Sequence, residues 1–253
     1  MTPVDRKVVY SAQGLSKHYG PVVACDAVNL EICAGEIMAI VGDNGAGKTT
    51  LVKMLTGAIM PDAGTLSRFG QKIELSSPMD AHRHGIEVVY QELALAPNLD
   101  ATANIYLGRE IRRRWGALPY PRILARKEMA SSARKELQRL EVNIASVTGV
   151  PVGKMSGGQR QSVAIARSCF WASDVLFMDE PTAALGVRES QAVLRLVRRV
   201  ADDGVAVVMV SHAMPHVVEL ADRIVVMRHG QKVEDRPSSG VDVETLVRLI
   251  VGI

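Results

Sequence analysis

Residues 42–50, GDNGAGKTT, place three glycines before a lysine and a hydroxyl, at the spacing G-x-x-x-x-G-K-[ST]. Glycines let backbone N–H groups turn inward around an anion, and a helix that begins behind them adds the positive end of its dipole. Lys48 could reach the β- and γ-phosphates of a nucleotide, and the hydroxyl of Thr49 could bind Mg²⁺. The candidate phosphate-binding residues are Gly42, Asp43, Asn44, Gly45, Ala46, Gly47, Lys48, Thr49 and Thr50.

Two adjacent acids follow the apolar run Val175–Met178. Ligands of open α/β sheets bind at the carboxyl ends of the strands, so Asp179 is expected to hold a metal ion there through water. Glu180 is then placed to orient or deprotonate an attacking water, a role worth about 10²–10⁴ in rate. Taken alone, the pair could also be two solvated acids at a strand end. The phosphate loop favours the catalytic interpretation.

The elements that must position these residues alternate between strands and helices, which predicts an α/β fold with a mainly parallel, doubly covered sheet. Strands are expected at 8–10, 28–32, 36–42, 65–69, 86–90, 175–178, 205–211 and 223–227. Helices are expected at 48–55, 188–200, 215–220 and 241–252. Apolar residues recur at helical spacing from about 95 to 165, interrupted by a basic, proline-bearing stretch. We therefore predict one domain, 1–253, with a core of about 6–94 and 166–253 and an inserted helical subdomain of about 95–165.

Composition bounds the possible functions. The chain has 253 residues, is 47% hydrophobic and carries a net charge of +3, which argues against disorder and gives nucleic-acid binding no support. Its three cysteines form no C-x-x-C pattern and are expected to be free thiols in a reducing compartment. The sequence shows no apolar run of bilayer length and no signal peptide. We expect a cytoplasmic chain whose membrane association comes through a partner.

A second glycine motif lies in KMSGGQRQSVAIARS, residues 154–168. Ser156 can cap the helix that follows, while Gly157 and Gly158 let its N-terminus approach an anion. Two anion-binding helix starts suit two sites shared between two copies of the chain. The alternative is an ordinary capped helix after a flexible loop.

From about residue 12 to 236 the chain resembles the nucleotide-binding subunit of an ATP-binding-cassette (ABC) transporter. MSGGQ resembles the family signature LSGGQ, with Met155 in place of leucine. By this resemblance Tyr19 stacks on adenine, Gln91 senses the metal and the γ-phosphate and faces the membrane partner, and His212 contacts the γ-phosphate.

The resemblance implies a P-loop NTPase core with a small N-terminal antiparallel β part and an inserted helical subdomain. It implies an ATPase with Lys48, Glu180 and His212 as catalytic residues, and Thr49, Gln91 and Asp179 as Mg²⁺ ligands. Two copies would sandwich two ATP molecules head to tail, each phosphate loop facing Ser156, Gly157, Gly158 and Gln159 of the other copy. The implied partners are transmembrane permease subunits and, indirectly, a solute-binding protein, at the cytoplasmic face of the inner membrane and without nucleic acid.

One departure from the family pattern follows the two acids. The family turn commonly reads S-A-L-D, and its aspartate helps the two sites of the dimer communicate. Here the turn reads Ala183, Ala184, Leu185, Gly186. We expect an active site with altered coupling.

Several stretches, among them 83–110 and 211–230, are similar to the simple-sugar (ribose, xylose, fructose type) importer ATPases, many of which carry two cassettes. With the single cassette seen here, a homodimer is expected. An importer ATPase for another substrate is the main alternative. A soluble ABC ATPase would need a coiled-coil insertion or a second cassette, and a regulatory cassette would usually lack Glu180 or Lys48. Arg112, Arg113 and Arg114 are expected in a solvated basic turn; contact with the permease or with anionic lipid head groups is the alternative.

Overall fold

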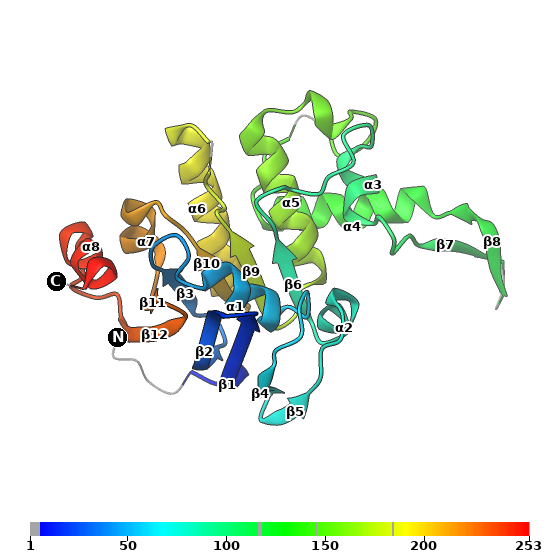
Figure 1. Ribbon diagram of the computed structural model, residues 1–253. Helices are drawn as coiled ribbons and strands as arrows, with labels where there is room; N and C mark the ends of the chain where they lie inside the picture. The colour runs from blue at the N-terminus through cyan, green and yellow to red at the C-terminus, as the bar shows by residue number, and fades with distance from the viewer. Residues whose placement is uncertain (1–5, 116–117, 145, 184, 253) are drawn as a thin grey trace. The chain divides into compact units, whose positions relative to one another are not determined.

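The computed structural model describes residues 6–115, 118–144, 146–183 and 185–252 (Figure 1). The chain divides into two compact units. Unit 1 comprises Met1–Gln91, Trp171–Ala183 and Val197–Ile253. Unit 2 comprises Glu92–Phe170 and Ala184–Leu196. Each unit is described by itself.

A six-stranded sheet in the order β12-β11-β3-β10-β9-β6 forms the centre of unit 1. Its strands are β3 (Ile37–Val41), β6 (Ile86–Val89), β9 (Val175–Asp179), β10 (Ala206–Val210), β11 (Arg223–Arg228) and β12 (Gln231–Pro237). Neighbouring strands pair in parallel except β12, which is antiparallel to β11 at the edge. Every residue of β3 and β10 is buried, as expected for strands covered on both faces. The mainly parallel sheet predicted from the sequence is confirmed.

The N-terminal part of unit 1 is a four-stranded antiparallel sheet in the order β2-β1-β4-β5. It consists of β1 (Val8–Tyr19), β2 (Val22–Cys33), β4 (Ala63–Arg68) and β5 (Gln71–Ile73). The predicted antiparallel β part is therefore present, with longer strands than the sequence suggested. Its buried residues join those of the parallel sheet and of helix α1 (Lys48–Leu55) in one hydrophobic core that includes Leu15, Leu30 and Phe177.

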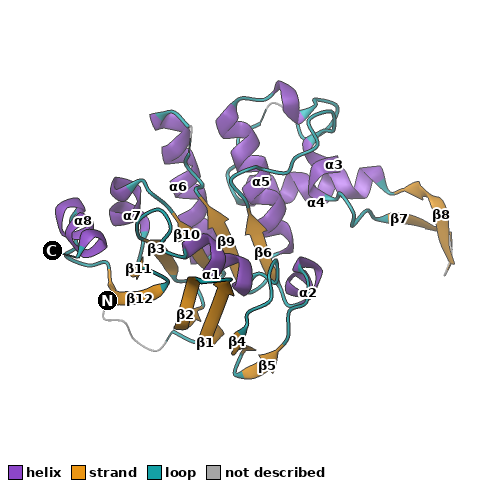
Figure 2. Ribbon diagram, in the orientation of Figure 1, coloured by secondary structure: helices purple, strands orange, loops and turns teal. Residues whose placement is uncertain are grey.

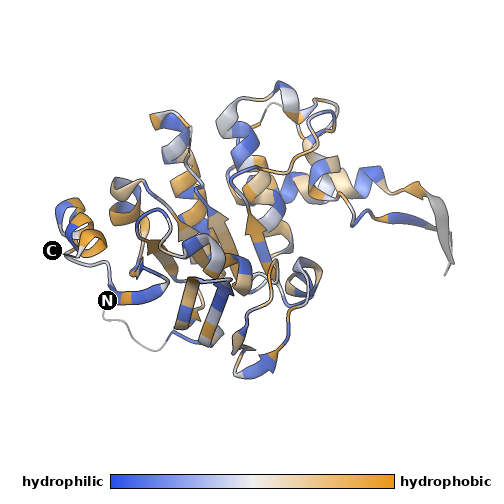
Figure 3. Cartoon of the chain, in the orientation of Figure 1, coloured by the Kyte–Doolittle hydropathy of each residue, from blue (hydrophilic) through white to orange (hydrophobic). Residues whose placement is uncertain are grey.

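The helices that belong wholly to unit 1 follow strands of the parallel sheet or connect the sheets (Figure 2). They are α1 (Lys48–Leu55), α2 (Pro78–Arg83), α7 (Met214–Leu220) and α8 (Val243–Val251). Helix α6 (Val187–Asp202) begins in unit 2 and ends in unit 1. The apolar strands that these helices cover stand out in orange in Figure 3.

Unit 2 is mostly helical but contains a hairpin. Its helices are α3 (Ala101–Ile105), α4 (Arg126–Arg139), the short 3₁₀ helix η1 (Val152–Lys154) and α5 (Gly157–Trp171), whose last residue belongs to unit 1. The expected basic turn is instead the antiparallel pair β7 (Arg112–Trp115) and β8 (Leu118–Leu124). Pro119 and Pro121 disrupt the alternating apolar pattern that usually indicates a strand, so this hairpin could not be predicted from the residue pattern.

Among the residues described, no helix combines the length and apolar character needed to cross a bilayer.

Candidate functional site

The phosphate loop runs from the end of β3 to the start of α1. Gly42, Gly45 and Gly47 all have positive φ angles, of 147°, 81° and 99°, which fold the loop tightly. Gly47 is the N-cap of α1 and offers no side-chain hydrogen bond. The first-turn N–H groups of Lys48, Thr49 and Thr50, which have no partner within the helix, are therefore available to an anion.

Two glycines of the loop are also required by the strands beside it. A Cβ atom at Gly42 would lie 2.1 Å from the carbonyl oxygen of Met227 on β11. A Cβ atom at Gly47 would lie 2.3 Å from the carbonyl oxygen of Ala24 on β2. At Gly45, in contrast, a Cβ would meet no atom within 4 Å, so only its φ angle favours glycine. The loop thus lies against backbone from both sheets of unit 1.

Lys48 is the cation of this loop. Its side chain is 6% exposed, and Nζ donates hydrogen bonds to the carbonyl oxygens of Gly42, at 2.7 Å, and Asp43, at 2.8 Å. Burial lowers the pKa of Lys48, an effect that the carboxylates of Glu180, Asp43 and Asp179 oppose. The ammonium group is thereby held against the loop backbone by two carbonyl oxygens.

The two acids lie where the parallel sheet ends. Asp179 is the last residue of β9 and pairs with Val210 of β10. Glu180 has a φ of 52°, a left-handed conformation that is rare for a non-glycine residue, and donates its N–H to the carbonyl oxygen of Val210 at 2.9 Å. This bond turns the Glu180 side chain toward His212, the second residue after β10.

Glu180 and His212 are neighbours at hydrogen-bonding and ion-pair distances. The Glu180 Oε2 atom accepts the backbone N–H of His212 at 3.3 Å, and Oε1 lies 3.5 Å from His212 Nε2. Glu180 Oε1 is nevertheless buried and has no hydrogen-bond partner among the described residues. A buried carboxylate oxygen without a donor is suited to accept a bond from a water that is to be activated.

Burial raises the pKa of both carboxyls at this edge. For Asp179 the nearby His212, Lys48 and Lys53 oppose the effect of burial. For Glu180 burial is the largest cause of the raised pKa, and the charge of Asp179 raises it further. The hydrogen bond from the His212 N–H opposes both by lowering the pKa. A carboxylate with a raised pKa is a stronger base, which suits the role of taking a proton.

These residues line one pocket of about 640 Å³, contained in unit 1. It brings together nearly all the site residues that the sequence pointed to in this unit: Tyr19, Asn44, Gly45, Ala46, Gly47, Lys48, Thr49, Thr50, Gln91, Asp179, Glu180 and His212. Gly42 and Asp43 hold Lys48 from behind. Tyr19 is 50% exposed at the end of the β1–β2 hairpin, opposite Val22, and Lys17 Nζ lies 5.9 Å from the centre of its ring. An exposed aromatic ring is suited to stack on a planar base.

The donor set at this pocket fits Mg²⁺. The hydroxyl of Thr49, the amide oxygen of Gln91 and the carboxylate of Asp179 are hard oxygen donors, and all three residues line the pocket. Among the described residues, no three His, Cys, Asp or Glu side chains are grouped to form a complete protein cage. Mg²⁺ uses few protein ligands and completes its shell with water and substrate phosphates, so this sparse set suits it.

The second glycine motif lies in unit 2, and none of its residues lines the 640 Å³ pocket of unit 1. Ser156 Oγ accepts the Gln159 N–H at 3.2 Å, and Gln159 Oε1 accepts the Ser156 N–H at 3.1 Å. This reciprocal capping box fixes the start of α5. A Cβ at Gly158 would lie 2.5 Å from Glu189 Cγ, whereas at Gly157 it would make only ordinary contact with Leu185. Within unit 2, Ser156, Gly158 and Gln159 line a separate hollow of about 320 Å³.

The comparisons with known proteins identify the family. The family model described as ABC transporter matches residues 25–183, which include the phosphate loop, the signature motif and the two acids. This chain belongs to the ABC transporter family. As an ABC cassette it is an ATPase, which confirms the family resemblance and the enzyme class predicted from its motifs.

Curated relatives match this ABC cassette over most of its length. It is 46% identical over 88% of its chain to the fructose import ATP-binding protein FrcA of Rhizobium meliloti, covering 86% of that protein. It is 39% identical to the xylose/arabinose import ATP-binding protein XylG of Sulfolobus acidocaldarius, over 92% of this chain and 90% of that protein. A ribose import ATP-binding protein of Burkholderia cenocepacia is 40% identical over 95% of this chain, which spans only 46% of that protein.

Solved structures confirm the fold of the cassette. A nucleotide-free ATP-binding cassette from an ABC transporter aligns with a TM-score of 0.80 at 22% identity, over 97% of this chain and 96% of that one. The ADP conformation of another such cassette aligns with a TM-score of 0.81 at 22% identity, over 97% of both chains. The P-loop NTPase core with an N-terminal antiparallel β part is thus the observed fold.

Sequence analysis of the ABC cassette missed part of the pocket wall. Val22, Val23, Ala24, Ala183 and Val210 also line it. Val22 and Val23 are 60% and 45% exposed beside Tyr19, so they extend its apolar surface. The signal that could have found them is the pair of valines two residues after the glycine that follows Tyr19. Ala184, part of the departing turn, lies outside the described residues.

Proposed function

We propose that this ABC ATPase uses the unit 1 pocket to bind and hydrolyse ATP and that it powers the import of a simple sugar through a separate permease. The observation that carries the first part is the convergence of Lys48, Glu180 and His212 in one pocket. The 46% identity to a fructose import ATP-binding protein supports the second part.

Each residue of the pocket has a proposed task. The loop N–H groups and Lys48 bind the β- and γ-phosphates, and Tyr19 with Val22 stacks on adenine. Glu180 accepts a proton from the attacking water, and His212 contacts the γ-phosphate at the end of β10. Thr49, Gln91 and Asp179 would hold Mg²⁺, which when bound neutralises charge on the phosphates.

We further propose that two copies form a head-to-tail dimer in which each pocket is completed by the signature motif of the other copy. The capped start of α5, with Ser156, Gly157, Gly158 and Gln159, provides a second anion-binding helix terminus, and none of these residues lines the unit 1 pocket. ATP then joins the two copies, and hydrolysis separates them.

The proposed partners are transmembrane permease subunits and, through them, a solute-binding protein, which would place the chain at the cytoplasmic face of the inner membrane. The names of the relatives support fructose, xylose, arabinose or ribose as the cargo. The alternatives are an importer for a non-sugar substrate and a non-transport ABC ATPase.

The test is to tag the chain in its host, purify it from membranes in mild detergent and identify its partners by mass spectrometry. A stoichiometric polytopic membrane protein supports the transporter assignment. The purified complex, supplied with its binding protein and each sugar in turn, should then show sugar-stimulated ATPase activity. A soluble partner, or stimulation by an amino acid instead of any sugar, would contradict the proposal.

A further inference from the structure

The positive charge of the chain is concentrated in one segment of unit 2. Residues 109–128 contain seven Arg and Lys residues and two acids, a net charge of +5, whereas the whole chain carries +3. The other 233 residues therefore carry a net charge of −2. A basic cluster of this density in an otherwise nearly neutral chain is a localised electrostatic feature that attracts anionic surfaces.

The structure gathers much of this charge around one hollow of about 1000 Å³, contained in unit 2. We call it the basic groove, and its lining residues are Ile111, Arg112, Arg113, Ile123, Leu124, Ala125, Arg126, Lys127 and Glu128. All four of its cations are exposed, and none forms an ion pair with a residue that the structure describes. Their charges are therefore not neutralised by neighbouring carboxylates at contact distance.

Aliphatic side chains are exposed among these cations. Ile123 and Leu124 are 45% and 38% exposed, and Leu124 is paired across the hairpin with Arg112. A lipid surface accommodates both aliphatic side chains and cations.

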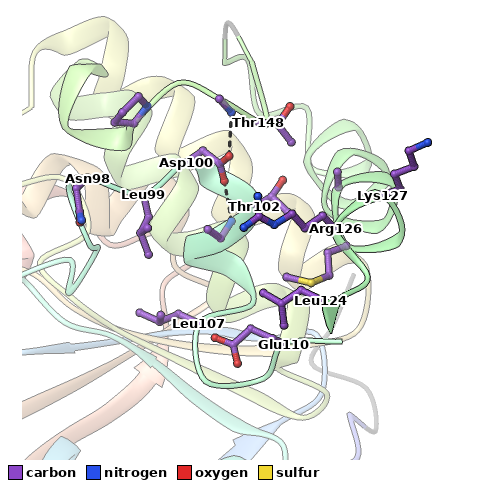
Figure 4. Close-up of a pocket in the computed structure, with 15 residues that line it drawn as sticks. Asn98, Leu99, Asp100, Thr102, Leu107, Glu110, Leu124, Arg126, Lys127 and Thr148 are labelled. Atoms are coloured by element: carbon purple, nitrogen blue, oxygen red, sulfur yellow. Dashed lines mark hydrogen bonds between the residues drawn. The ribbon is translucent and has the colours of Figure 1, made fainter. Parts of the chain in front are cut away.

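The start of α4 adds an anion-binding element to the groove. Its N-cap, Ala125, makes no side-chain hydrogen bond, and the first turn carries Arg126, Lys127 and the acid Glu128, a net charge of +1. The helix dipole disfavours the two cations at this end. An anion bound here would meet both the free N–H groups and the cations. The neighbouring hollow of unit 2 shares Leu124, Arg126 and Lys127 with the groove, and Figure 4 shows the Lys127 side chain pointing away from that hollow.

We propose that the basic groove binds the anionic surface of a phospholipid bilayer. Arg112, Arg113 and Lys127, with the start of α4, contact lipid phosphates, while Ile123 and Leu124 enter the boundary between head groups and acyl chains. This contact is made by the cassette itself and requires neither the permease nor the proposed transport function.

The test uses the full chain without a permease. Its co-sedimentation is measured with vesicles of phosphatidylcholine alone and of phosphatidylcholine and phosphatidylglycerol in equal parts. We expect binding to the anionic vesicles only, weakened by salt. Arg112→Gln with Arg113→Gln should lower the affinity by roughly thirty-fold, since each basic residue near the surface contributes about 1 kcal/mol, a factor of about five.

The matched control is Arg134→Gln with Lys135→Gln, which removes the same charge from two exposed residues farther along α4, outside the groove. It should bind anionic vesicles nearly as well as the unmodified chain. A second pair, Ile123→Ser with Leu124→Ser, should weaken binding at unchanged charge. ATPase activity and thermal unfolding of every variant establish that it is folded.

Three results would overturn the proposal. One is equal binding to neutral and anionic vesicles, and another is an equal loss in the groove and control variants. The third is no vesicle binding by the unmodified chain, which would turn the groove into a site for an acidic protein segment.

Discussion

The carboxylate of Glu189 lies where a side chain on Gly186 would begin. A Cβ atom at Gly186 would be 2.6 Å from Glu189 Oε2, and the stem of the same glutamate covers Gly158 of the signature motif. In the turn that lacks the usual aspartate, an acid from the first turn of α6 therefore occupies the adjacent space. The departure from the family pattern removes a residue without removing negative charge from this turn.

Gly186→Asp should change the cooperativity of ATP hydrolysis more than its maximal rate. The new side chain would displace the Glu189 carboxylate and place two like charges together, in a turn outside the unit 1 pocket. The measurement is ATPase rate against ATP concentration, analysed for the Hill coefficient and the plateau. Glu189→Gln, which keeps the shape but removes the charge, separates crowding from repulsion. Loss of basal ATPase activity in Gly186→Asp would refute the prediction.

Lys48→Ala should weaken ATP binding by about tenfold or more and abolish hydrolysis. The substitution removes the buried cation and also both of its bonds to the loop carbonyls, and bonds to charged groups contribute about 1.5–3 kcal/mol each. Nucleotide affinity is measured by equilibrium titration. Lys72→Ala, at an exposed lysine on β5, is the control and should leave affinity unchanged. Unaltered affinity and turnover in Lys48→Ala would remove Lys48 from the site.

Glu180→Gln should keep ATP binding, accumulate an ATP-bound dimer and lower turnover by about 10²–10⁴. The amide keeps the shape of the side chain but cannot take a proton from water. Turnover is measured at saturating ATP, and the dimer by size-exclusion chromatography with ATP present. Glu74→Gln, at an exposed glutamate of unit 1, should behave as the unmodified chain. Normal turnover in Glu180→Gln would show that another group is the base.

The pH dependence of ATPase activity should show an acid limb above the ordinary range of a glutamate. Burial and the charge of Asp179 raise the pKa of Glu180, so the carboxyl becomes protonated, and useless as a base, at a higher pH than a solvated glutamate. Activity should therefore fall as pH falls through this raised pKa. The profile of kcat/KM against pH locates the limb, and the residual activity of Glu180→Gln should lack it.

Asp222 should make the fold sensitive to acid. Burial favours its neutral form, but bonds from the Ile37 N–H, Arg198 and Arg6 outweigh burial and lower its pKa. A lowered pKa means that stability is present above the unfolded-state pKa, near 3.9, and is lost as pH falls through the folded value.

Asp222→Asn should accordingly lower the free energy of unfolding at neutral pH by about 1–3 kcal/mol and lose less on acidification. Urea unfolding at neutral and acid pH measures both effects. Asp202→Asn, at an exposed aspartate near the end of α6, is the control and should change neither. An unchanged free energy of unfolding in Asp222→Asn at both pH values would contradict the prediction.

Local sequence patterns pointed to several residues that line the unit 1 pocket, but not to the rest of its wall. The phosphate loop and the pair Asp179–Glu180 were recognisable because glycine spacing and a buried strand are local properties. Tyr19 and Gln91 line the same pocket, but only the family resemblance predicted this. Local sequence patterns cannot show that residues so far apart in the chain meet. Periodicity likewise could not indicate the β7–β8 hairpin, where two prolines and a run of arginines conceal the strand pattern.

Contacts between side chains of the folded chain could not be predicted from local sequence patterns. Nothing in the spacing of Gly186 and Glu189 indicates that one fills the space of the other, because a helix start and a turn can meet in many ways. The orphaned Oε1 of Glu180 depends on which neighbours fail to reach it, a property only of the folded chain.

The close approach of Gly42 to β11 and of Gly47 to β2 gives the phosphate loop a mechanical role. With carbonyl groups of two different sheets at van der Waals contact on either side, the loop cannot shift without pushing one strand or the other. A displacement of the loop on binding or release of phosphates would therefore push β11 of the parallel sheet and β2 of the antiparallel sheet. The loop therefore contacts both sheets, and a larger residue at Gly42 or Gly47 would collide with β11 or β2.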